Sequence, residues 1–121
     1  MELLKFDGVD VGYDEQMKAE FGATAKRFAR EVVKHMGFKE FDISWNAGGI
    51  AVSGDVTIRG MYNDNNGAYV VISTPSNHGI MFRTIKNMRD YTGGNNNWLK
   101  LSMFENEKKV AEHIKNNTFG R

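Results

Sequence analysis

Residues 63–73 read NDNNGAYVVIS, a polar turn that leads directly into an apolar run. The pair Asn66-Gly67 at the end of the turn favours a tight hairpin, because both residue types tolerate a positive φ. Residues 68–73 are rich in β-branched and aromatic side chains, and their number suits a strand. This stretch therefore predicts the second half of a β-hairpin, with neighbouring strands before and after it in the chain.

The segments around this hairpin also alternate between apolar and polar residues. Residues 41–45 (FDISW) and 50–58 (IAVSGDVTI) alternate on the upstream side, and Gly54 in the second segment predicts a bulge. Residues 80–85 (IMFRTI) predict a further strand downstream, and residues 98–101 (WLKL) allow a short fifth strand. Because turns separate these runs, the pattern predicts an antiparallel β-meander.

Amphipathic helices are predicted near both ends of the chain. The first runs from an N-cap at Asp14 to a stop at Gly37. Its apolar stripe consists of Met17, Phe21, Ala25, Phe28, Val32 and Met36. The second helix begins at a capping box formed by Ser102 and Glu105. Residues 3–12 predict a short extended arm, which could form an edge strand.

Together these elements predict an α+β fold. It consists of an antiparallel four- to five-stranded β-meander with an N-terminal and a C-terminal helix packed on one face. An amphipathic helix needs an apolar surface to cover, so both helices should lie on the same side of the sheet. The other face would then be free for solvent or a partner. The 121 residues suit one domain that spans residues 1–121.

Charge and composition exclude several classes of protein. A formal net charge of +1 argues against a DNA mimic, which needs an acidic excess, and against a duplex-coating protein, which is usually strongly basic. The absence of cysteine excludes disulfides and thiolate chemistry. The sequence shows neither a signal peptide nor a membrane span of ~20 apolar residues, so we expect a cytoplasmic protein without a membrane partner.

The bases are concentrated in two regions. Residues 21–40 carry five bases against two acids, and residues 81–100 carry four against one. In the first region, a helical wheel places four cations opposite the apolar stripe: Lys26, Arg27, Arg30 and Lys34. This secondary basic face is either an ordinary solvated helix surface or a contact for phosphates or an acidic partner.

The second region, residues 83–98, is the strongest candidate for a binding loop. Arginine can form a bidentate fork to phosphate, paired glycines let backbone amides approach an anion, and aromatic rings offer stacking surfaces. The predicted ligand-binding residues are Arg83, Lys86, Arg89, Asp90, Tyr91, Gly93, Gly94, Asn96, Asn97 and Trp98. The structural alternative is that Ile85 and Trp98 are core anchors and that the glycines and asparagines only shape turns.

Metal and catalytic motifs are weak. His35, His78 and His113 lack the spacing that places two imidazoles on one helical face, so we predict no metal site and no cofactor. The sequence contains no nucleophile elbow and no phosphate loop ending in Lys-Ser or Lys-Thr. Asp90 and Tyr91 could transfer a proton beside Arg89, but such a pair more often organises a loop. We therefore predict no catalytic residue.

The binding-loop region resembles a group of short, largely uncharacterised proteins carried by phages, plasmids and conjugative elements of Gram-positive gut bacteria. The resemblance lies in a strand ending at Arg83, the run Arg-Asp-Tyr-Thr-Gly-Gly at 89–94, and then Asn96, Asn97 and Trp98. It covers about a seventh of the chain. The resemblance implies an accessory protein of a mobile element, and it raises the inhibition of a host defence system as a role.

Two shorter resemblances point to nucleic acids. Residues 66–76 look like the corresponding strand of the stage V sporulation protein G family, which are small nucleic-acid binders. The order helix, strands, helix and the start of the last helix at residues 108–112 are similar to double-stranded RNA-binding domains. The Gly-Pro-x-His segment of that second family is missing here.

The sequence thus favours a non-catalytic binding protein of a mobile element, with an anionic ligand, nucleic acid or nucleotide, bound through residues 83–98. The alternative is a protein-binding inhibitor of a bacterial defence system, such as an anti-CRISPR-type protein. A small enzyme ranks third.

Overall fold

The computed structural model describes residues 1–76, 79–91 and 94–121. The predicted site residue Gly93 and the histidine His78 lie outside the described residues. The elements, in chain order, are η1 (Glu2–Phe6), α1 (Glu15–Lys34), β1 (Glu40–Asn46), β2 (Asp55–Met61), β3 (Gly67–Ile72), β4 (Ile80–Ile85), β5 (Asn97–Leu99), η2 (Leu101–Met103) and α2 (Glu107–Thr118).

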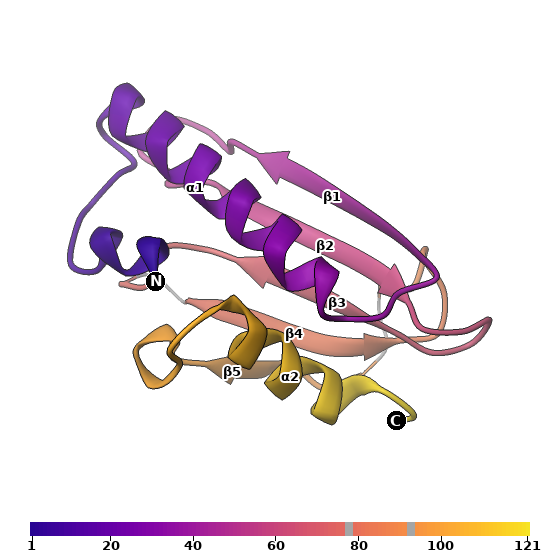
Figure 1. The fold of residues 1–121 in the computed structure, drawn as a ribbon. Helices are drawn as coiled ribbons and strands as arrows, with labels where there is room; N and C mark the ends of the chain where they lie inside the picture. Colours follow the sequence, from indigo (N-terminus) through magenta and orange to yellow (C-terminus); the bar gives the residue numbers. More distant parts are fainter. Residues whose placement is uncertain (77–78, 92–93) are drawn as a thin grey trace.

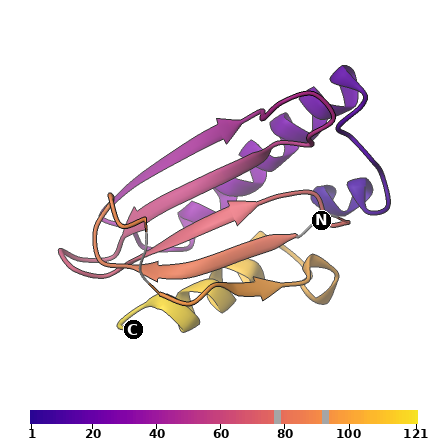
Figure 2. The same cartoon turned by 180° about the vertical axis from the view of Figure 1, so that it is seen from behind.

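The five strands form one antiparallel sheet in the order β1-β2-β3-β4-β5, so each strand pairs with its neighbour in the sequence. Both helices cover the same face: α1 lies over β1 and β2, and α2 lies over β3 and β4 (Figure 1). The predicted α+β meander with two helices on one face is confirmed. Figure 2 shows the sheet from its other side, which neither of the described helices α1 and α2 covers and which we call the open face.

The alternation of apolar residues along the strands explains which face the helices cover. Val56, Ile58, Val70 and Phe82 are buried and belong to the core between sheet and helices. Each such side chain stabilises the fold by roughly 1.5–3 kcal/mol when it is fully buried. The residues between them in each strand therefore point to the open face, because successive side chains in a strand alternate sides.

The N-cap predicted for the first helix is confirmed, and the one predicted for the second is wrong. Asp14 Oδ1 accepts a hydrogen bond of 3.1 Å from the amide of Met17 and caps α1. In α2 the cap is Asn106, whose Oδ1 accepts a bond of 3.0 Å from the amide of Lys109. The predicted capping box at Ser102 therefore does not start the helix, because residues 101–103 form a separate 3-10 turn that buries Leu101.

The predicted extended arm at residues 3–12 is also wrong. Residues Glu2–Phe6 form the 3-10 helix η1, which places Leu3 and Phe6 on one side and buries both. The rings of Phe6 and Phe21 meet edge to face with centroids 5.4 Å apart. The buried residues of this segment are thus three positions apart, as in a 3-10 helix, and do not alternate as in a strand.

Two glycines have roles that differ from those predicted. The pairing of β1 with β2, both within the described residues, runs without a bulge from Glu40–Met61 to Asn46–Asp55, so Gly54 closes the preceding loop with φ 83°. Residues 50–54 are not part of the strand, and Ile50 is 98% exposed. Gly67 does not have the predicted positive φ. A Cβ there would lie 2.1 Å from the carbonyl oxygen of Gly60, so glycine is required for space.

Candidate functional site

A row of polar side chains crosses the open face of the sheet. The register pairs Arg59 on β2 with Tyr69 on β3, and Tyr69 with Arg83 on β4. Arg59 and Tyr69 each lie between buried neighbours, and Arg83 follows the buried core residue Phe82, so all three point to the open face. The guanidinium carbons of Arg59 and Arg83 lie 4.2 and 4.9 Å from the centroid of the Tyr69 ring. Tyr69 is therefore held between two cations.

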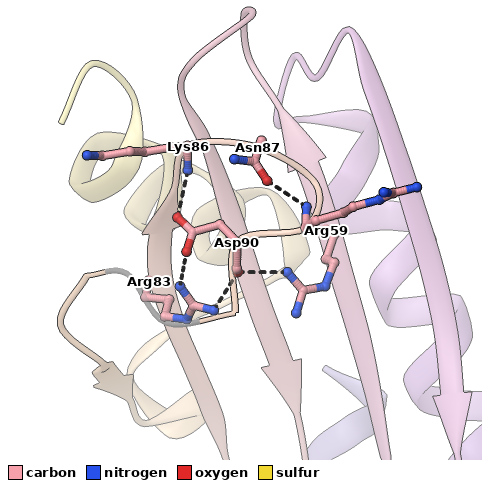
Figure 3. Close-up of polar contacts among 6 residues, drawn as sticks. Arg59, Arg83, Lys86, Asn87 and Asp90 are labelled. Atoms are coloured by element: carbon pink, nitrogen blue, oxygen red, sulfur yellow. Dashed lines mark hydrogen bonds and ion pairs between the residues drawn. The ribbon is translucent and has the colours of Figure 1, made fainter.

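The loop after β4 is anchored on this row through Asp90. The backbone carbonyl of Asp90 accepts hydrogen bonds from Arg83 Nη2 at 2.8 Å and from Arg59 Nη1 at 3.1 Å. Its carboxylate lies 3.8 Å from Arg83 Nη1 and accepts a bond of 3.0 Å from the amide of Lys86 (Figure 3). One residue thus ties the loop both to β2 and β4 and to its own first turn.

A second turn stiffens the tip of the same loop. Asn87 Oδ1 accepts a hydrogen bond of 2.9 Å from the amide of Arg89, and the carbonyl of Asn87 accepts one of 3.2 Å from the amide of Asp90. Such bonds from an asparagine side chain to the backbone two residues on replace part of a regular turn. The loop 86–91 is therefore held by its own polar groups as well as by the sheet.

Arg83 is the member of the predicted binding set with the clearest structural role. Its side chain is only 7% exposed, and it makes both a bond to the carbonyl and an ion pair to the carboxylate of Asp90. The carboxylate of Asp90 is 12% exposed. Since both groups are largely removed from water, the pair organises the loop, as expected for the Asp-Tyr segment, and leaves little of either group to contact a ligand.

The loop also brings an exposed ring onto the open face. The Tyr91 ring lies over the guanidinium group of Arg59, whose central carbon is 4.4 Å from the ring centroid. Arg59 is thereby enclosed between Tyr69 and Tyr91. Tyr91 itself remains 70% exposed, so a large part of its ring is open to solvent. Cation–π contacts of this kind stabilise by about 0.5–1 kcal/mol at exposed sites, enough to orient the ring.

Trp98 supplies the second exposed ring. It lies on β5 opposite Met81 and next to the buried Leu99, so it points to the open face and is 57% exposed. The structure therefore does not use Trp98 as a core anchor. The strand spacing places β5 about 14 Å from β2, where Tyr91 is held over Arg59. The two rings thus stand at separate points on one surface.

The remaining predicted site residues lie around these rings. Lys86, Arg89, Asn96 and Asn97 are exposed, and the Asn97 side chain donates a bond of 3.0 Å to the carbonyl of Asn95. Gly94 adopts a positive φ of 78°, where a Cβ would lie 3.0 Å from the carbonyl oxygen of Thr84. Gly94 is therefore required for the close passage of the loop over β4.

Sequence reasoning missed Arg59 and Tyr69. Both lie in segments that were recognised as strands, each at a polar position between apolar ones. A two-residue turn at Asn66-Gly67 would have placed Arg59 opposite Thr74, whereas the observed register closes the longer turn 62–66 and pairs Arg59 with Tyr69. The pair therefore depends on a register that the predicted turn did not give, and a slip of one residue would turn both side chains to the other face.

The secondary basic face lies on the opposite side of the molecule from the loop. It belongs to α1, which covers the other face of the sheet (Figures 1 and 2). Arg27 Nε lies 3.7 Å from Glu2, Lys34 Nζ lies 2.7 Å from Glu31, and the Lys26 ammonium lies 5.9 Å from the Trp45 ring centroid. The hydrogen bond from Lys34 lowers the pKa of Glu31.

These contacts separate the two predicted basic regions. Acidic neighbours face two of the four cations on α1, so their field at a distance is reduced. Because the sheet lies between α1 and the open face, the two regions cannot form one continuous surface. A single site must therefore be built from the loop and the open face alone.

The described residues hold no group of three or more His, Asp or Glu side chains placed to share a metal ion. Among the helices of the same residues, none has both the length and the apolar character of a membrane span. Comparison with protein-family models, curated proteins and solved structures yields no match for this chain. The arguments for function therefore come from the geometry of the site.

Proposed function

We propose that this protein is a non-catalytic module that binds single-stranded nucleic acid on the open face of its sheet, with the loop at 83–98 as part of the surface. The observation that carries the proposal is the pair of exposed rings, Tyr91 and Trp98, on one open sheet face. Unpaired bases stack on such rings whatever their sequence, because every base has a π face. Partly buried hydrogen bonds and a cation–π contact hold one of the rings, Tyr91, in place.

The cations around the rings suit a phosphate backbone. Lys86 and Arg89 are exposed at the start of the loop, whereas the guanidinium groups of Arg59 and Arg83 are occupied by Asp90 and by tyrosine rings. At the far edge of the sheet, the acidic residue Asp42 on β1 lies opposite Arg59 in the strand register. A strand of nucleic acid would therefore follow the side of the open face that includes β4, β5 and the loop.

The small number of exposed cations predicts a shallow dependence on salt. Single strands give a slope of about −0.7 for each neutralised phosphate in a plot of log K against log salt concentration. Contacts from Lys86 and Arg89 alone therefore predict a slope of about −1.4. Fluorescence anisotropy of labelled single-stranded DNA, RNA and duplex DNA between ~50 and ~200 mM salt measures this slope directly. Binding of duplex in preference to both single strands, or a slope steeper than about −4, would contradict the proposal.

A protein-binding inhibitor of a bacterial defence system is the second candidate. Its support lies at the other end of the molecule, where Ile50 is 98% and Tyr13 is 78% exposed. Lys18 Nζ donates a bond of 3.1 Å to the carbonyl of Gly49, and Gly12 packs closely on Ala51, so the loop that carries Ile50 is tied down. Large apolar side chains on a fixed loop are typical of contact points between proteins.

The two candidate functions predict different effects of the same substitutions. If the second candidate is right, replacing Tyr13 and Ile50 by serine should remove a stoichiometric partner recovered from a bacterial lysate. The same replacements should leave nucleic-acid binding unchanged if the first is right. Recovery of no partner by the native protein would count against the inhibitor role.

A further inference from the structure

A cleft of about 710 Å³ is lined by the loop residues Lys86, Asp90 and Gly94. Its walls are the turn between β2 and β3, the end of β4, the first residues of the loop, and the C-terminal residues Gly120 and Arg121. These segments are far apart in the sequence, so the cleft exists only in the folded protein. It is larger than the cleft beside Arg30 on α1 and the cleft beside Lys100.

Buried hydrogen bonds fix the walls of this cleft. Asn66 is only 6% exposed; its Nδ2 donates to the carbonyl of Thr118 at 3.1 Å and its Oδ1 accepts from the amide of Gly120 at 2.8 Å. Thr118 is also bonded to the hydroxyl of Tyr62 at 2.7 Å. Both ends of the Asn66 amide are thus used to hold the C-terminal segment, and with it Arg121, against the β2–β3 turn.

The charges that face the cleft are mainly positive. Lys86 and Arg121 contribute two cations, and no described residue forms an ion pair with the Lys86 ammonium. The one acid in the wall, Asp90, already binds Arg83 and the amide of Lys86. Figure 3 shows the Lys86 side chain pointing away from Asp90 and Arg59. The nearby Asp64 is bound by Lys39.

Amide side chains add uncharged hydrogen-bond donors. Asn63 and Asn65 line the cleft, and Asn63 Oδ1 accepts a bond of 3.0 Å from the amide of Asn65. The oxygen of Asn63 is thereby turned to the backbone of its own turn, which leaves its NH₂ group for a ligand. Arg121 Nη2 donates a bond of 3.4 Å to the carbonyl of Asn116, which leaves its other N–H groups for a ligand. Together with the Lys86 ammonium and a side-chain amide they form a donor set that suits the several oxygens of a phosphoryl group.

We propose that this cleft binds a phosphoryl group, either the terminal phosphate of a nucleic-acid strand or the phosphate of a free nucleotide. The inference rests on the proposed function, because Lys86 and Asp90, which line the cleft, belong to the same loop that carries the Tyr91 ring. A strand stacked on Tyr91 that passes over this loop brings its end to Lys86 and Arg121. The cleft therefore distinguishes a phosphorylated strand end from a hydroxyl end.

The test compares three probes at ~50 mM salt: a single strand with a 5′-phosphate, the same strand with a 5′-hydroxyl, and adenosine monophosphate. We expect the phosphorylated strand to bind about tenfold more tightly than the hydroxyl strand, which is the effect of one added charged hydrogen-bonding group. Arg121→Gln should reduce that difference to less than about twofold, and it should leave binding of the hydroxyl strand unchanged. Arg30→Gln removes one exposed cation on the other side of the sheet and serves as the matched control.

The outcomes of this test distinguish strand ends from free nucleotides as the source of the phosphoryl group. They also distinguish failure of the phosphoryl site from failure of the proposed strand-binding function. A preference for the phosphorylated strand that depends on Arg121 assigns the cleft to strand ends. Binding of adenosine monophosphate that Arg121→Gln abolishes, without binding of either strand, assigns it to free nucleotides and contradicts the proposed strand-binding function. Equal binding of the two strands, together with no binding of the mononucleotide, would overturn the phosphoryl site and leave the proposed function standing.

Discussion

At the residue scale, Asp90 decides how the loop is held. Its backbone carbonyl and its carboxylate together meet both arginines of the open-face row and the amide of Lys86. The Asp90 carboxylate is 12% exposed and has lost much of its hydration. Its charge would therefore destabilise the folded state if its hydrogen-bonding and ion-pair partners were removed. Asp90 was predicted as a ligand-binding residue, with loop organisation as the more common role of an Asp-Tyr pair, and the structure shows the partners through which it holds the loop.

Arg83 and Arg89 give the sharpest contrast between two cations of the same loop. Arg83→Gln removes the charge that faces the buried carboxylate, so we expect the free energy of unfolding to fall by roughly 3 kcal/mol. Arg89→Ala changes an exposed residue and should alter stability by less than about 0.5 kcal/mol. Urea denaturation of both variants measures the difference. Equal effects of the two substitutions would show that the Arg83–Asp90 contact does not anchor the loop.

At the element scale, the contact between β2 and β3 requires glycine at position 67. A Cβ at Gly67 would lie 2.1 Å from the carbonyl oxygen of Gly60 on the paired strand, a backbone atom that cannot move aside alone. Gly67→Ala should therefore reduce the free energy of unfolding by about 1–3 kcal/mol, as overpacking does. In Gly49→Ala, the added Cβ meets no atom within 4 Å, and we expect little change. Thermal unfolding compares the two, and similar shifts would refute the steric account.

The attachment of α2 to the sheet predicts a response to alkaline pH. Burial raises the pKa of Tyr62 to about 12, partly opposed by its hydrogen bond with Thr118. In the unfolded chain the hydroxyl ionises near pH 10. The stabilisation is therefore complete below about pH 10 and is lost as the pH rises toward 12. From pH 9 to pH 11, the native protein should lose about 1 kcal/mol more stability than Tyr62→Phe.

Denaturant titrations of both proteins at the two pH values measure this difference. The comparison between pH values within each protein removes the constant effect of losing the hydrogen bond between Tyr62 and Thr118. Equal losses in the two proteins would mean that Tyr62 is not the group that couples alkaline ionisation to unfolding.

The elements also show where sequence reasoning succeeds and where it ends. The meander and α1 follow from strict periodicity and from a local cap at Asp14, and both were predicted. The start of β2 was placed too early because Ile50 and Val52 continue the alternation, although they lie in a loop. Alternation identifies an apolar residue but does not reveal whether another element covers it.

The candidate site was also predicted from the sequence only in part. The exposed residues Lys86, Arg89, Tyr91 and Trp98 were identified from the composition of one segment. Their arrangement depends on Arg59, which is 31 positions before Asp90 in the sequence. A contact of this kind is set by strand register, which no local pattern records. The composition of this segment therefore identified the loop. Only the fold shows that the Arg83 side chain is covered by the loop and supports it, instead of being exposed to solvent.

At the scale of the whole molecule, the sheet divides the protein into a side packed against helices and the open face. Both helices and the secondary basic face lie on one side, and the loop, its two exposed rings and the row from Arg59 to Arg83 lie on the other (Figures 1 and 2). This division is compatible with the proposed binding of an anionic strand by a nearly neutral protein. In that proposal the contact would be made mainly by stacking, and only a few cations would be needed.

The most direct test of this account is the affinity of Tyr91→Leu/Trp98→Leu for single-stranded nucleic acid, measured by fluorescence anisotropy at ~50 mM salt. Stacking contributes about 1–3 kcal/mol for each base, so the loss of both rings should weaken binding by at least about 30-fold. Tyr13→Leu removes an aromatic ring at the other end of the molecule, where Tyr13 is 78% exposed against 70% for Tyr91 and 57% for Trp98. This variant should bind like the native protein. An affinity of the double variant within about twofold of the native value would contradict the central claim that the open face binds by stacking.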